Sequence, residues 1–147
     1  MPRYETWITT PLPPEEAFSR LSRFDRAADW DPGIDEGSML TPEPVERGSR
    51  FMLRARFLGR SLPLEYEVVD FIPDTHLVLR AENAYVRSID TLTFDALSGG
   101  TEIYYDARLE PKGLARIATP FFALAFRRIG DAAAAGLRHY LNPVRSE

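Results

Sequence analysis

Three polar side chains on predicted strands carry the chemistry that this sequence could perform. If a turn at Gly99-Gly100 sets the register of the strands that flank it, Asp90 lies with the apolar residues of its strand on the inner face. A carboxylate there is unfavourable without a partner, so burial would raise its pKa, and hydrogen bonds from Tyr66 or Tyr105 would oppose that rise. A carboxylic acid and two phenols in an apolar pocket could hold a ligand hydroxyl or ketone. They could also move protons in an aldol-type cyclisation or dehydration.

Asp90 also has two simpler interpretations. A bulge near Ser88 would turn its carboxyl group outward, and an inward carboxyl group could make only a structural hydrogen bond. We expect the other polar candidates on the surface, since His76 begins a strand after a turn and His139 lies near a helix end. Arg87 alternates with Asp90 along its strand, so we expect it on the outer face of the sheet.

The composition excludes several classes of protein. A chain of 147 residues is expected to form one hydrophobic core, and 44% hydrophobic with 27% charged residues is ordinary for a globular domain. The absence of cysteine excludes disulfides, thiolate nucleophiles and thiolate metal ligands, and two histidines are too few for a histidine metal cluster. We therefore expect no metal and no cofactor. A net charge of −4 without a basic run argues against nucleic-acid binding.

The sequence shows no segment that is long and apolar enough to cross a membrane, and its N-terminus lacks the apolar core of a signal peptide. We expect a cytoplasmic protein without stable membrane insertion. Monomer and homodimer are both left open.

The N-terminal third predicts one strand and two short helices. Residues Arg3–Thr10 favour a strand, because they are rich in threonine and aromatic side chains. Pro13 or Pro14 then opens a helix with carboxylates in its first turn. A second short helix follows from about Phe24 to Trp30, and Asp31-Pro32-Gly33 stops it.

From Ile34 to Pro111 the chain predicts about six successive antiparallel strands, whose short turns fix the register. The predicted turns and one pair for each are Gly59-Arg60 with Phe57 opposite Leu62, Pro73-Asp74 with Val68 opposite Leu79, and Gly99-Gly100 with Leu92 opposite Ala107. These registers give each strand an apolar inner face and a polar outer face.

A long amphipathic helix should end the chain. Thr119 and Pro120 resemble an N-cap and a first-turn proline, after a short helical lead-in at Leu114–Ala118. The predicted apolar side comprises Phe121, Phe122, Ala125, Ile129, Ala132, Ala133, Gly136 and Tyr140. We therefore predict an α+β domain spanning residues 1–147, with a twisted antiparallel sheet of six to seven strands around this helix.

Four segments together resemble the SRPBCC group of proteins. They are Pro13-Pro14-Glu15-Glu16-Ala17-Phe18, Phe24-Asp25 with Trp30-Asp31-Pro32-Gly33, Leu62–Val68 and Ala125–Asp131. This group includes polyketide cyclases/dehydrases and lipid-transport proteins related to START domains and to the birch-pollen allergen. The resemblance covers nearly the whole chain. It implies the helix-grip fold, in which the curved sheet wraps the C-terminal helix around a hydrophobic pocket.

The resemblance implies a site between sheet and helix, although the same side chains could simply form a filled core. The candidate catalytic residues are Asp90, Tyr105 and Tyr66. The candidate ligand-binding residues are Trp30, Phe51, Leu53, Phe57, Leu64, Leu79, Phe94, Phe121, Phe122, Ala125 and Ile129.

Three functions are compatible with this site. The first is binding or carriage of a small hydrophobic molecule, lipid or polyketide-like. The second is a polyketide cyclase or dehydratase that uses the carboxyl group and the phenols as acid and base. The third is a regulatory or stress-related interaction module without a ligand.

Overall fold

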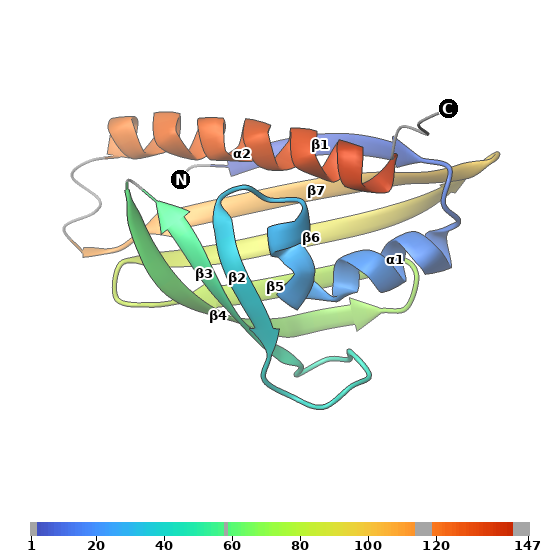
Figure 1. Ribbon diagram of the computed structural model, residues 1–147, viewed down its shortest axis with the longest axis horizontal. Helices are drawn as coiled ribbons and strands as arrows, with labels where there is room; N and C mark the ends of the chain where they lie inside the picture. Colours follow the sequence, from blue (N-terminus) through green and yellow to red (C-terminus); the bar gives the residue numbers. More distant parts are fainter. Residues whose placement is uncertain (1–2, 58, 114–118, 143–147) are drawn as a thin grey trace.

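A seven-stranded antiparallel sheet in the order β1-β7-β6-β5-β4-β3-β2 forms the body of the molecule (Figure 1). The structure is a computed structural model, which describes residues 3–57, 59–113 and 119–142. The strands are β1 (Arg3–Thr10), β2 (Ile34–Met39), β3 (Arg50–Phe57), β4 (Arg60–Ile72), β5 (His76–Glu82), β6 (Val86–Leu97) and β7 (Gly100–Pro111). The predicted first strand and the six antiparallel strands that follow are confirmed.

Two short helices lie between β1 and β2, as the sequence predicts. Helix α1 spans Pro14–Ser22, with Pro13 at its N-cap and two glutamates in its first turn. The second, η1, is a 3-10 helix over Phe24–Asp29. The ring of Phe18 packs edge-on against Phe94, and the ring of Phe24 packs edge-on against Tyr66. These helices therefore fill part of the concave face of the sheet.

The long helix α2 (Thr119–Leu141) crosses the sheet beside β1, as Figure 1 shows. Hydrogen bonds join the two elements along their length. Tyr4 Oη donates to Asp131 Oδ1 at 2.6 Å, and Thr10 Oγ1 donates to the carbonyl of Leu141 at 2.9 Å. This attachment fixes the height of the helix above the sheet. The predicted lead-in at Leu114–Ala118 lies outside the described residues.

The buried side of α2 agrees with the predicted one in part, since Gly136 faces the backbone of Trp30 and Tyr140 packs against the core. Ala132 is exposed, whereas Ala134, Leu137 and Leu141 are buried. The prediction followed the alanines and aromatic residues, but attachment to β1 turns the leucines of the last two turns toward the sheet. Ile129 and Ala133 are half-buried on that side.

The β3–β4 hairpin is shifted by two residues from its predicted register. Phe57 pairs with Arg60 instead of Leu62. Gly59, with φ 79°, ends the loop instead of beginning it, because a left-handed conformation at this position suits glycine and a tight turn.

The β6–β7 hairpin shows the same shift, since Leu92 pairs with Tyr105 instead of Ala107. Gly99, with φ 86°, ends this loop. A shift of two residues preserves the parity of a strand, so both predicted inner faces are correct.

The predicted pairing between β4 and β5 is correct, because Val68 lies opposite Leu79. At the turn itself, however, Ile72 pairs with His76, so the loop is one residue longer than predicted. A bulge between Val68 and Asp70 restores the register and adds local twist.

The hydrophobic core fills the concave face of the sheet near α1 and η1. Within the described residues, no helix is both long and apolar enough to span a membrane.

Candidate functional site

A cavity of about 150 Å³ lies between α2 and the concave face of the sheet. Its sheet wall includes Leu62, Leu64, Val86, Ala107 and Leu109, and its helix wall includes Phe126, Ile129, Gly130, Ala133, Ala134 and Leu137. Most of this surface is apolar. The cavity is also lined, near the end of η1 and the start of β2, by Trp30, Asp31, Gly33 and Ile34. The exposed Arg56 belongs to the lining as well.

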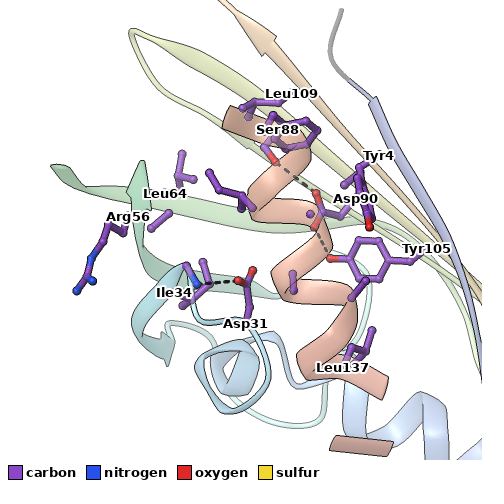
Figure 2. A pocket seen from close by; sticks show the side chains of 18 of the residues that line it. Tyr4, Asp31, Ile34, Arg56, Leu64, Ser88, Asp90, Tyr105, Leu109 and Leu137 are labelled. Carbon is purple, nitrogen blue, oxygen red and sulfur yellow. Dashed lines mark hydrogen bonds between the residues drawn. The ribbon is translucent and has the colours of Figure 1, made fainter. Parts of the chain in front are cut away.

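A chain of hydrogen bonds forms the polar part of the sheet wall. Tyr66 Oη donates to Ser88 Oγ at 2.9 Å, and Ser88 Oγ donates to Asp90 Oδ1 at 3.3 Å. Tyr105 Oη donates to Asp90 Oδ2, as Figure 2 shows. All four side chains are buried. The regular β6–β7 pairing excludes the bulge that would have turned Asp90 outward.

Burial dominates the protonation of Asp90. It raises the pKa of this carboxyl group to about 6, although the hydrogen bonds from Tyr105 and Ser88 oppose the rise and the charge of Asp31 adds to it. Burial and the nearby Asp90 also raise the pKa values of the Tyr66 and Tyr105 phenols above their usual range. The phenols therefore stay protonated near neutral pH and act as donors.

A second carboxyl group, Asp31, lines the same cavity from the turn after η1. Its Oδ1 accepts a hydrogen bond from the backbone N–H of Gly33 at 2.8 Å (Figure 2). Burial raises the pKa of Asp31 to about 6, against the effect of that hydrogen bond. The resemblance implies that Trp30 and Asp31 lie near the pocket mouth, but Asp31 was not a candidate site residue, because aspartate before Pro32-Gly33 is already explained as a turn residue.

The structure places six of the candidate residues on the cavity wall: Trp30, Leu64, Tyr66, Asp90, Tyr105 and Ile129. Four others, Phe51, Leu53, Leu79 and Phe94, are nearly fully buried and do not line the cavity. Their positions on the concave face were predicted correctly, but α1 and η1 fill the space above that part of the sheet. Ala125 is half-buried outside the lining. The side chains of Phe57, Phe121 and Phe122 lie outside the described part of the structure.

Replacing Tyr105 with phenylalanine should raise the pKa of Asp90 above 6, because the variant loses the strongest hydrogen bond that holds this pKa down. Near neutral pH the buried carboxylate would also lose a donor, which should destabilise the fold by about 1–3 kcal/mol. Carbon-detected NMR titration of the Asp90 carboxyl group measures the first effect, and urea unfolding measures the second. Tyr104→Phe is the matched control, since Tyr104 lies on the outer face and bonds to Glu5.

Metal ligands do not gather in the part of this cavity that the structure describes. Within residues 3–57, 59–113 and 119–142, no three histidine or acidic side chains lie close enough to hold a metal ion.

The fold and the cavity are those of a START-type helix-grip domain, a ligand-binding fold. Residues 1–142 match the family described as polyketide cyclase / dehydrase and lipid transport, and the chain belongs to this family. The resemblance to the SRPBCC group is thereby confirmed. No curated protein matches the sequence.

Several solved structures share this fold at low sequence identity. A START superfamily protein from Mycobacterium smegmatis is 15% identical, with a TM-score of 0.78 over 95% of this chain and 96% of that one. The protein TTHA0849 from Thermus thermophilus is 14% identical, with a TM-score of 0.76 over 95% of each chain. The Zhui aromatase/cyclase from a Streptomyces species is 11% identical, with a TM-score of 0.74 over 95% of this chain and 90% of that one. At these identities the likeness shows the fold alone.

Proposed function

We propose that this protein binds a small, largely apolar molecule of about one ring in the cavity between α2 and the sheet. The observation that carries the proposal is the cavity itself, with apolar walls and one hydrogen-bonded polar patch. An apolar cavity of about 150 Å³ is known from another protein to hold benzene, whereas pockets for drug-sized ligands measure roughly 300–1,000 Å³. A compact ring therefore fits this cavity better than a lipid chain does.

The polar patch would orient such a ligand. Tyr66, Ser88, Asp90 and Tyr105 lie together on β4, β6 and β7, while the helix wall opposite is apolar. A ring would lie against the apolar residues of α2, and a polar substituent would face a carboxyl group. The walls would supply the affinity and the carboxyl groups the orientation.

Native mass spectrometry of the purified protein, followed by NMR titration with toluene, tests the proposal. We expect a co-purifying small molecule or saturable toluene binding at about one site per chain. Ala133→Phe should lower toluene affinity at least about tenfold, because Ala133 lines the cavity and the new ring would occupy a space of about 150 Å³. Ala132→Phe is the control, since this neighbour on α2 is exposed.

Two results would contradict the proposal. One is the absence of any co-purifying molecule and of toluene binding in a sample that unfolds cooperatively. The other is an equal loss of toluene binding in both variants, because Ala132 lies outside the cavity lining.

A second candidate function is that of a cyclase or dehydratase on a polyketide-like substrate. The observation that favours it is the presence of two carboxyl groups in one cavity, each with a pKa raised to about 6. Such groups can accept or donate a proton near neutral pH, as general acid–base catalysis requires. Dehydration of a small β-hydroxyketone tests this function. Asp90→Asn should lower its rate by at least about a hundredfold while toluene still binds.

A further inference from the structure

The charges that line the cavity are unbalanced. Asp31 and Asp90 both lie in the wall, and Arg56 is the one basic residue in the described lining. The Arg56 side chain is 63% exposed, and its Nη2 binds Asp35 Oδ1 at 2.8 Å on the outside. Arg138 donates to Thr6 of the lining but is itself exposed and is not part of the wall. Among the described residues, the interior therefore presents negative charge without a matching cation.

The hydroxyl groups of the polar patch are already used as donors. Tyr66 donates to Ser88, Ser88 donates to Asp90, and Tyr105 donates to Asp90. Each of these hydroxyl groups has a single hydrogen, so none is left for a ligand carbonyl or carboxylate. Tyr4 Oη, also in the lining, donates to Asp131. The lining's remaining side-chain donors are uncharged, on Trp30 and Thr6, or belong to the exposed and already paired Arg56.

The two carboxyl groups differ in how fully they are used. Both oxygens of Asp90 accept hydrogen bonds within the chain of side chains described above. Asp31 accepts one, at Oδ1 from Gly33, while its Oδ2 has no donor among the residues that the structure describes. Asp31 Oδ2 is therefore the one oxygen of the two carboxyl groups that has no donor among the described residues, so it is the acceptor most open to a ligand.

We infer that the cavity selects small ring compounds whose polar end donates hydrogen bonds, as alcohols, phenols and protonated amines do, and rejects those that end in a carboxylate. Asp31 is the residue that receives the donor. The inference rests on the proposed binding function and adds the chemical class of the ligand. A carboxylate in this cavity would lose its hydration, meet two like charges and find no cation in the described lining except the exposed, already paired Arg56.

Four probes that share one ring and one further carbon test this selectivity: toluene, benzyl alcohol, benzylamine and benzoate. They are titrated by NMR at about pH 8, where carboxyl groups with a pKa of about 6 are ionised. We expect benzylamine to bind most tightly, benzyl alcohol next, and benzoate at least about tenfold more weakly than benzylamine. Benzoate binding as tight as that of benzylamine overturns the inference. If toluene and the other three all fail to bind, the proposed function itself is wrong and the inference falls with it.

Asp31→Asn tests the role of this residue. Asparagine keeps the acceptor for the Gly33 N–H and removes the charge. The ratio of benzylamine to toluene affinity should fall at least about tenfold. Asp29→Asn is the matched control, because Asp29 is exposed and lies two residues earlier, outside the lining. An equal fall in both variants would assign the effect to overall charge and overturn the role of Asp31. If Asp31→Asn does not fold, the four-probe series with the wild-type protein still decides the selectivity.

Discussion

Gly136→Ala should destabilise the protein by about 3 kcal/mol or more, or prevent it from folding. A Cβ atom at Gly136 would lie 1.8 Å from the carbonyl oxygen of Trp30, closer than any real contact of this kind. Alanine is favoured over glycine inside a helix by about 1 kcal/mol, so helix propensity alone predicts the opposite sign. The close approach of α2 to the backbone at Trp30 decides the outcome, because a backbone carbonyl cannot rotate away as a side chain can.

Neither side of this contact can move freely. Helix α2 is held to β1 by the bond from Thr10 Oγ1 to the carbonyl of Leu141, and the N–H of Trp30 is bonded to the carbonyl of Ala27. Because Trp30 also lines the cavity, a forced separation would widen the cavity as well as weaken the packing.

Urea unfolding of the wild type and two glycine variants measures the effect. Gly130→Ala is the graded control: its Cβ would lie 2.4 Å from a ring atom of Tyr4, a side chain that can turn aside at the expense of its bond to Asp131. We expect Gly136→Ala to be clearly the more damaging. A Gly136→Ala protein that is more stable than the wild type would contradict the close packing of α2 on Trp30.

The face of the sheet on which each strand residue lies could be predicted from the sequence. The residue that lies opposite it on the neighbouring strand could not. Asp90 is on the inner face whether Leu92 lies opposite Tyr105 or Ala107, since a shift of two residues leaves every side chain on its side. The position of a glycine within a two-residue loop decides between those registers. A pattern of apolar residues carries no information about that position, because both registers preserve it.

The extent of the cavity depended on contacts between elements that are distant in sequence. Phe51 and Phe94 have the same pattern along their strands as Leu64, which lines the cavity. What separates Phe94 from the cavity is the placement of Phe18 on α1, whose ring covers it. The role of Asp31 was hidden for the same reason, because only the packing of the η1–β2 turn against the sheet and α2 brings a turn residue into the cavity.

Asp90 should make the wild-type protein less stable as the pH rises from about 4 to about 7. Its pKa is about 6 in the folded protein and 3.8 for an unperturbed carboxyl group, so between these values the folded state binds the proton more tightly than the unfolded chain. Raising the pH removes that advantage. A difference of about two pKa units corresponds to roughly 3 kcal/mol, most of it lost by pH 7. Asp31 should act in the same direction, since its pKa is also raised to about 6.

Asp90→Asn should remove this contribution, because the amide stays uncharged while its oxygen can still accept the bond from Tyr105. The free energy of unfolding of both proteins, measured by urea titration between about pH 4 and pH 8, gives a difference curve. We expect the free energy of unfolding of the variant to rise by up to roughly 3 kcal/mol relative to that of the wild type as the pH rises through that range. The gain is smaller to the extent that the neutral amide accepts a weaker hydrogen bond from Tyr105 than the carboxylate does.

Glu82 titrates below this window, since Lys112 and Arg87 lower its pKa to about 2. Asp95→Asn is the control, because Asp95 is exposed on the same strand. A flat difference curve for Asp90→Asn would mean that folding does not raise the pKa of Asp90. An equal slope for Asp95→Asn would mean that the pH dependence does not come from the burial of Asp90.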